Sequence, residues 1–188
     1  TASDFVSYTD SWSGGGSLRW DQEIGSVNLA TITAYRKSRS DINFDFDGIQ
    51  FPIAQINVRH LDQQFSQELQ LTSSSSGRFT WVMGAYFLDA KARYAPFTLN
   101  IGGAPFLTVN NGQRSQSIAG YAQGTYEIAD DTHLTLGGRY TSEKRSTIDR
   151  QLVGVPTGGV LVTIPEQSIT FDKFTFRASL DHRFSSEV

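Results

Sequence analysis

The sequence lacks cysteine altogether, so neither a disulfide framework nor a thiolate-ligated metal site is available to it. No apolar stretch approaches the roughly 18 residues that a transmembrane helix needs, which excludes a helical membrane span. Basic residues are not in excess either, because 16 lysines and arginines stand against 19 aspartates and glutamates, a net charge of −3. We therefore expect no nucleic-acid partner.

What the sequence does contain is typical of β structure. Its 188 residues include 13 phenylalanines, 7 tyrosines and 17 glycines, a combination that suits strands separated by turns. The length is enough for one sizeable domain or for a piece of a larger one. The composition does not exclude a membrane β-barrel, because barrel strands carry their apolar residues in alternation rather than in a continuous run.

The most regular stretch is a hairpin from Gln113 to Ser146. Its two halves meet at the polar turn Ala129–Thr132, and each half alternates between polar residues and apolar or small ones. Because strand side chains alternate at period two, each half has one apolar face and one polar face. The apolar or small residues are Ile118, Gly120, Ala122, Gly124 and Tyr126 in the first half and Leu134, Leu136, Gly138 and Tyr140 in the second.

Similar alternation elsewhere brings the expected number of long strands to about seven: residues 16–23, 27–47, 61–72, 78–92, the two halves of the hairpin, and 169–184. Residues 1–15 are polar and rich in Gly and Ser, and we interpret them as a loop. Short turns are expected at 24–26, 73–77 and 129–132, and long connections at 48–58, 93–112 and 149–168. For residues 27–47, the sequence does not decide whether the odd-numbered or the even-numbered side chains face the lumen, because both sets are only moderately apolar.

The connections alternate strictly between short and long, as in outer-membrane barrels with short periplasmic turns and long outer loops. The predicted fold is therefore all-β: an antiparallel up-and-down meander of about seven long strands, forming a section of a transmembrane β-barrel. Trp81 and Tyr126 lie close to short turns, so we expect them in the periplasmic aromatic girdle. Two other classes stay open, a passive porin-like channel and a soluble all-β module that binds carbohydrate.

Five segments resemble the barrel of TonB-dependent outer-membrane receptors: SVNLATITAYR, FSQELQLTS, GRFTWVMGAYFL, AGYAQGTYEIADDTHLTLGGRYTSEKR and FTFRASLDHRF. The resemblance covers about residues 16–188. It implies a barrel of about 22 strands with a plugged lumen, in the outer membrane of a Gram-negative bacterium. The implied function is import of a scarce nutrient such as a ferric siderophore. The implied partners are outer-membrane lipid, a small nutrient ligand such as an iron chelate, and the TonB complex.

The sequence also departs from that family. It contains no plug domain, no segment that would contact TonB, and no closing strand that ends in an aromatic residue. Seven strands would leave two open edges, which a membrane does not tolerate. We therefore expect residues 1–188 to be a middle section of a receptor barrel, and contact with TonB to run through the missing plug domain.

Polar strand residues are the candidates for a functional site, because that parity would line the lumen of a barrel. We interpret them first as a structural polar network that packs against a plug, and only second as direct substrate contacts. The lumen-facing candidates are Glu68, Gln70, Gln123, Glu127, Arg139, Arg177 and Asp181.

The sequence gives little support for enzyme activity or for metal binding. No nucleophile elbow, zinc-binding HExxH motif or catalytic dyad occurs, so we expect no enzyme activity and no cofactor. A D-x-N-x-D pattern is formed by Asp41, Asn43, Asp45 and Asp47. Phe46 and Pro52 stand where a calcium-binding EF-hand loop needs Gly and Glu, so an acidic strand face near an outer loop is the simpler interpretation. A calcium site at the membrane rim is the alternative.

Overall fold

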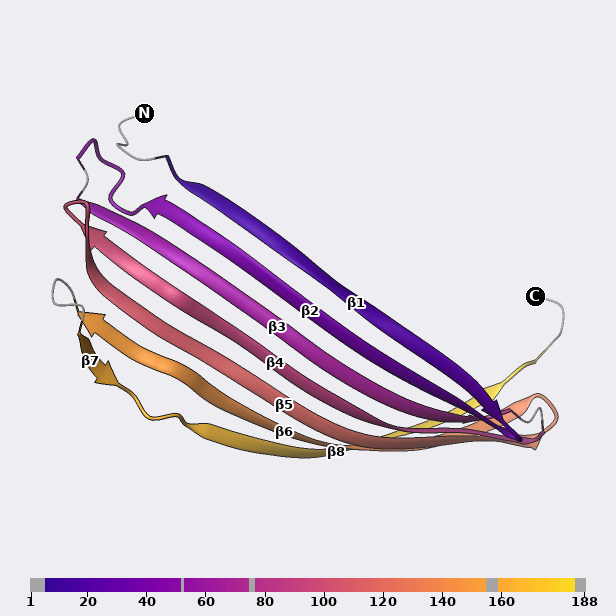
Figure 1. Cartoon of the computed structure of the whole chain (residues 1–188). Coiled ribbons are helices and arrows are strands. Elements are labelled where there is room, and N and C mark those ends of the chain that lie inside the picture. Colours follow the sequence, from indigo (N-terminus) through magenta and orange to yellow (C-terminus); the bar gives the residue numbers. More distant parts are fainter. Residues whose placement is uncertain (1–5, 52, 75–76, 155–158, 185–188) are drawn as a thin grey trace.

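In the computed structural model the described residues, 6–51, 53–74, 77–154 and 159–184, form one antiparallel sheet of eight strands. Strands β1 to β6 pair in sequence order, and β6 then pairs with β7 at one end and with β8 along most of its length (Figure 1). The strands are β1 (Tyr8–Ile24), β2 (Val27–Asp45), β3 (Ala54–Ser73), β4 (Phe79–Ile101), β5 (Ala104–Ala129), β6 (Thr132–Gly154), β7 (Val160–Thr163) and β8 (Ser168–His182).

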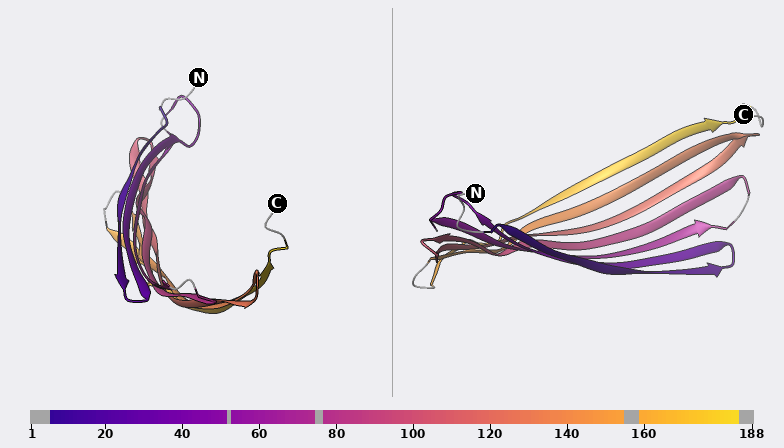
Figure 2. Two further views of the ribbon diagram at one scale, coloured as in Figure 1. Left: turned by 90° about the vertical axis from the view of Figure 1, so that its right-hand side faces the viewer. Right: turned by 90° about the horizontal axis from the view of Figure 1, so that it is seen from above.

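The sheet is a single layer that curves into an open trough (Figure 2). In the part of the chain that the structure describes, no second layer packs on either face; β1 forms one edge of the sheet, and β7 and β8, which both pair with β6, form the other. The predicted all-β meander of long strands is confirmed. None of the described segments is a helix of the length and apolar character that crossing a membrane requires.

Two of the expected short turns are tight hairpins. Ile24 pairs with Val27, so Gly25 and Ser26 alone form the first turn, with Gly25 at a φ of 61°. Glycine reaches this left-handed conformation without the steric cost that a Cβ atom brings. In the central hairpin Ala129 pairs with Thr132, and Asp131 adopts a φ of 58°. The predicted turns at 24–26 and 129–132 are confirmed.

Most of the predicted long connections are wrong, because the strands continue through them. The segment 93–112 consists almost entirely of β4 and β5, which meet at the two-residue turn Gly102–Gly103. Pro96 and Pro105 indicated a loop, since proline cannot donate to a strand ladder. The sheet accommodates each proline at a register shift instead, one between Tyr94 and Phe97 and one between Leu99 and Asn100.

Other strands are also longer than the sequence predicted. The loop interpretation of residues 1–15 is wrong from Tyr8 onward, because β1 begins there and pairs with β2 through Gly14 and Gly15; residues 1–5 lie outside the described part. β3 begins at Ala54 rather than near residue 61, and β6 continues to Gly154. The short β7 is an eighth strand that the alternation pattern did not predict, since four residues are too few to show a period.

The register settles which side chains share a face. Tyr35 pairs with Phe65, and Phe87 pairs with Ile118, on what we call the apolar face. Large side chains of this face are exposed, as Phe176 is at 82%. The parity of β2 that the sequence left open is thereby decided: its odd-numbered residues from Val27 to Tyr35 belong to the apolar face. Trp81 and Tyr126 also lie on this face, near the short turns.

The opposite side, which we call the polar face, is the inner side of the trough. Its small side chains are among the most covered in the described chain, with Ala119 at 3%, Ala30 and Thr135 at 6% and Ser117 at 8% exposure. Side chains converge on the concave side of a curved sheet, so short ones there are covered by their neighbours. The curvature therefore turns polar residues inward and apolar residues outward.

Candidate functional site

The centre of the polar face holds a hydrogen-bonded contact that bridges β3 and β5. The Tyr121 hydroxyl donates to Glu68 Oε1 over 2.7 Å, and Gln70 Nε2 donates to the same hydroxyl over 3.4 Å. Gly84 of β4 is the register partner of both Gln70 and Tyr121. A Cβ atom on Gly84 would come within 2.6 Å of the Tyr121 ring. Glycine at this position therefore allows the ring to cross β4 and reach β3.

Arg139 of β6 completes this group from the other side. Its guanidinium carbon lies 5.9 Å from the centroid of the Tyr86 ring and 5.8 Å from that of Tyr121, within the range of cation–π attraction. Its Nε donates to Thr141 Oγ1 over 3.1 Å, which fixes the direction of the side chain. We call Glu68, Gln70, Tyr86, Tyr121 and Arg139 the central cluster.

The structure places all seven predicted site residues on the polar face, but it gathers only some of them. Glu68, Gln123, Arg139 and Arg177 line one open groove of about 290 Å³, with Tyr121 between them. Gln70 joins this group through its hydrogen bond to Tyr121. The remaining two lie apart, toward the short-turn end of the face, where the His133 backbone pairs with both Glu127 and Asp181.

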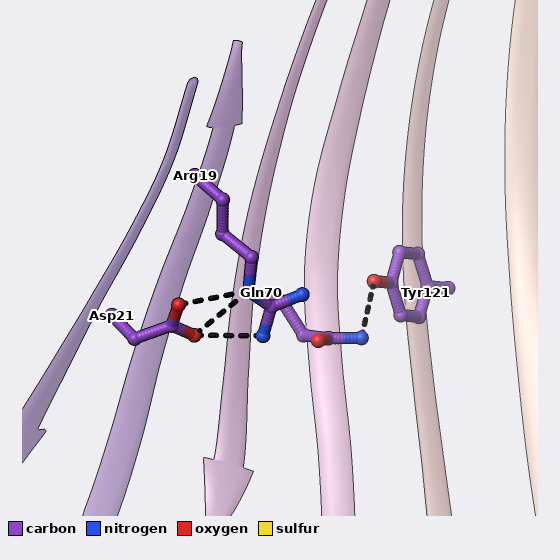
Figure 3. A network of polar contacts seen from close by, with 4 residues as sticks. All are labelled: Arg19, Asp21, Gln70 and Tyr121. Carbon is purple, nitrogen blue, oxygen red and sulfur yellow. Dashed lines mark hydrogen bonds and ion pairs between the residues drawn. The ribbon is translucent and has the colours of Figure 1, made fainter. Parts of the chain in front are cut away.

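A second charged group lies on the same face at the edge strand β1. Arg19 Nη2 donates to Asp21 Oδ1 over 2.7 Å and Arg19 Nε donates to Asp21 Oδ2 over 2.8 Å. Figure 3 shows this ion pair together with Gln70 and Tyr121. Asp21 and Gln70 are both register partners of Ala30, on its two sides, so the polar face continues without interruption from β1 to β6.

A larger hollow of about 730 Å³ lies on the polar face farther from the short turns. Its floor consists of small residues such as Ala34, Ala90 and Ser115, and Asp62 is one of its charged side chains. Asp62 Oδ2 accepts a hydrogen bond from Ser38 Oγ over 2.9 Å and lies 3.2 Å from Nδ1 of His60. This hollow therefore has an organised polar wall beside a floor of short side chains.

The three aspartates of the calcium-loop pattern, Asp41, Asp45 and Asp47, form hydrogen bonds or ion pairs with other groups of the protein. Asp41 pairs with Arg39 and Arg59, and the hydrogen bond from Arg59 lowers the pKa of the Asp41 carboxyl, reinforced by Arg39 and opposed by burial. Asp45 Oδ1 accepts from the backbone N–H groups of Asp47 and Gly48, so it organises the turn that follows β2. Within the described residues no group of three or more His, Cys, Asp or Glu side chains could hold a metal ion.

Sequence reasoning missed the two tyrosines of the central cluster. Tyr121 shares the parity of Gln123, which was a usable signal, but an aromatic residue on a polar face did not stand out as a site residue. Its role depends on Gly84, which lies 37 residues earlier and becomes its neighbour only through strand pairing. The arrangement offers hydrogen-bond acceptors, one guanidinium and aromatic rings on a fixed wall, a set suited to binding and positioning.

Comparison with known proteins agrees with this architecture. A family model described as "TonB dependent receptor-like, beta-barrel" matches residues 1–188. Among solved structures, the chain resembles the ferric yersiniabactin uptake receptor FyuA from Yersinia pestis, with a TM-score of 0.77 at 16% sequence identity. The match covers 96% of this chain and 27% of the receptor. A comparison with curated protein sequences finds no match.

Proposed function

The chain belongs to the TonB-dependent receptor-like β-barrel family, and from that premise we propose that it forms part of the wall of an outer-membrane import receptor. In this proposal the complete barrel resides in the outer membrane of a Gram-negative bacterium. It imports a scarce nutrient such as a ferric siderophore, and it draws energy from the TonB complex through a plug domain. The chain contributes binding and passage rather than an enzymatic step.

One observation carries the proposal: the two faces of the sheet differ in character along the full set of long strands. Exposed apolar side chains such as Leu136, at 55%, and Leu180, at 65%, cover the convex face, while the central cluster and the Arg19–Asp21 pair occupy the concave face. Lipid outside and a polar lumen inside produce this division. A soluble sandwich would bury its apolar face against a second sheet.

The unpaired sheet edges support the placement of this chain within a larger barrel. In the described residues β1 pairs only with β2 and β8 only with β6, so the outer sides of both strands are open. Membrane sheets close because an unpaired backbone group in hydrocarbon costs several kcal/mol. We propose that further strands of the same receptor complete both edges.

We propose that Glu68, Gln70, Gln123, Glu127, Arg139, Arg177 and Asp181 line the lumen of that barrel. The central cluster would then form a rigid patch at which a plug domain packs. The larger hollow near Asp62 lies beyond it, on the side where nutrient would enter. Small residues on its floor would leave room for a bulky chelate.

The test uses the complete receptor in a bacterial strain deprived of its own iron-chelate receptors. Growth on a panel of ferric siderophores under iron limitation is expected, and it should disappear when TonB is deleted. Membrane fractionation should place the receptor in the outer membrane. Uptake that survives loss of TonB would instead indicate a passive channel, and recovery of the protein in the soluble fraction without detergent would contradict the membrane assignment.

A further inference from the structure

The two faces of the sheet exchange character at the strand ends that lie far from the short turns, where β7 joins the sheet (Figure 1). One register row there runs across six strands on the inner side of the trough, and every residue in it is apolar. A second apolar row continues it farther along the strands, from Phe44 of β2 to Leu107 of β5. We call these two rows the apolar belt. Its first row consists of Ile42, Val58, Phe97, Val109, Leu152 and Val162.

The outward side of the same strand ends is polar. Asn43 pairs with Asn57, and Asn57 pairs with Thr98. The hydroxyl oxygens of Thr98 and Thr108 lie 3.3 Å apart on this side. The outward surface of a barrel wall changes from apolar to polar where the wall leaves the membrane and meets water. In the proposed barrel the apolar belt therefore lies beyond the membrane-spanning part of the strands and faces the lumen.

Two β-bulges turn belt residues inward. Between Tyr94 and Phe97, β4 has one more residue than the facing segments of β3 and β5, and between Ile148 and Gln151, β6 has one more than β5. An extra residue reverses the alternation of side chains beyond it, so without these bulges Phe97 and Leu152 would point outward. The bulges therefore keep the row apolar across β4 and β6, where plain alternation would interrupt it.

No other part of the described chain covers the apolar belt, because the sheet is a single layer. Strands that complete the barrel would join at β1 on one side and at β7 and β8 on the other, beside the belt rather than over it. The central cluster, where we propose that a plug packs, is far away, since Glu68 is about 33 Å from Val58 along β3. The occupant of the belt is therefore a molecule that enters the lumen.

The apolar belt has the proportions and the neutrality of a site for an extended apolar chain. At a strand spacing of about 4.8 Å, its first row extends about 24 Å across the sheet, whereas the two rows together are only about 7 Å wide. None of the residues in either row carries a charge. A strip that is long, narrow and neutral fits an acyl chain better than a single aromatic ring.

Polar groups lie directly beside the belt, in the larger hollow. Asp62, in the wall of this hollow, is about 13 Å from Val58 along β3. Arg36 lines the same hollow and extends over Gly15 of β1, where an added Cβ atom would come within 2.9 Å of the Arg36 Cγ. Arg36 forms no ion pair within the described residues. An apolar strip thus adjoins a site that offers hydrogen bonds and a guanidinium.

We propose that the receptor imports an amphiphilic chelate, whose oxygen-rich head binds in the larger hollow and whose acyl chain lies along the apolar belt. The inference rests on the proposed function and deepens it by naming the class of nutrient. Each CH₂ group that leaves water for the belt should raise the affinity by about two- to four-fold, because the free energy of burial grows with the apolar area covered. A hydrophilic chelate would leave the belt exposed to water.

The experiment measures binding to the complete receptor in cells from which TonB has been deleted, so that transport does not contribute. The probes are ferrioxamine B labelled with radioactive iron and acylated on its free amine with an acetyl, octanoyl or dodecanoyl group. Cells that lack the receptor give the background. The wild type is expected to bind the dodecanoyl form at least about 100-fold more tightly than the acetyl form, because the longer chain covers more of the belt.

A pair of matched variants tests the role of the belt. Val109→Thr places a hydroxyl in the first row at nearly constant volume, and it should weaken binding of the dodecanoyl form by about five- to ten-fold while leaving the acetyl form unchanged. Val153→Thr is the control, because Val153 pairs with Thr108 on the outward side of the neighbouring strand. It should bind all three probes as the wild type does.

Each result decides the inference. A gain in affinity with chain length that Val109→Thr reduces and Val153→Thr does not reduce supports it. Equal losses in the two variants, or no binding of any of the three probes, would overturn it. Equal affinity for the three probes would also overturn it, and would indicate that another segment of the receptor covers the belt.

The proposed function is tested separately, by TonB-dependent growth on the panel of ferric siderophores. If growth occurs but chain length has no effect on binding, only this inference falls. If growth is absent as well, the proposed function is wrong too.

Discussion

The ring of Tyr121 lies across Gly84, so close that a Cβ atom on Gly84 would stand 2.6 Å from the Tyr121 hydroxyl oxygen. The two residues belong to neighbouring strands, and the close approach lets the tyrosine reach Glu68 on the strand beyond. Because Gly84 has no side chain, the Tyr121 side chain can cross β4 and link β5 to β3.

Replacing Gly84 with alanine should destabilise the barrel by about 1–3 kcal/mol, because the new methyl group would stand 2.6 Å from both the Leu69 carbonyl oxygen and the Tyr121 ring and would force the ring away from Glu68. Unfolding in urea, followed by the heat-modifiable shift on gels, measures the change. Gly120→Ala is the matched control, since an added Cβ at Gly120 meets nothing within 4 Å. Equal effects at the two glycines would show that the close approach is not responsible.

Arginine in place of Leu136 should destabilise the membrane-inserted barrel by roughly 2–4 kcal/mol, because this exposed side chain lies on the apolar face, which would contact lipid. Gln123→Arg, on the polar face of the neighbouring strand, should cost much less, because the lumen is wet. Equilibrium folding into phosphatidylcholine vesicles compares the two variants. A larger penalty at Gln123 than at Leu136 would mean that the two faces have been assigned the wrong way round.

The three tryptophans all lie on the apolar face and should report different depths in the bilayer. Trp20 pairs with Thr31, whose other register partner is Leu69, whereas Trp12 pairs with Arg39, roughly 26 Å farther along the strand. In single-tryptophan barrels, Trp20 should be quenched most by lipids brominated deep in the acyl chain. Trp12 should respond to bromine near the headgroup, as should Trp81 beside the short turns. Identical quenching profiles would contradict this arrangement.

The pairing between β2 and β3 around Asp41 and Arg59, at the ends of these strands far from the short turns, should weaken in acid. The hydrogen bond from Arg59 holds the pKa of Asp41 below its value in the unfolded chain, which is about 3.9. A carboxyl with a lowered folded pKa contributes stability above the unfolded pKa and loses it as pH falls through the folded pKa. Amide protection factors near Asp41 should therefore decline as pH falls below about 4, and Asp41→Asn should remove that dependence.

Local alternation in the sequence was sufficient to predict the class of fold, the tight turn at Ala129–Thr132 and the parity of the seven polar candidates. The alternation of side chains along a strand is a local property, so it does not depend on which strands pair with it. Family resemblance rested on the same segments, and the match of the family model over residues 1–188 confirms it.

Strand ends and contacts across the sheet were decided only by the tertiary structure. Pro96 and Pro105 indicate loops when read locally, yet register shifts accommodate them within β4 and β5. The parity of β2 became definite only when Tyr35 was paired with Phe65. Gly84 and Tyr121 lie 37 residues apart in the sequence and meet only through the pairing of β4 with β5. Periodicity therefore determined which face each residue belongs to, while register determined which residues meet on that face.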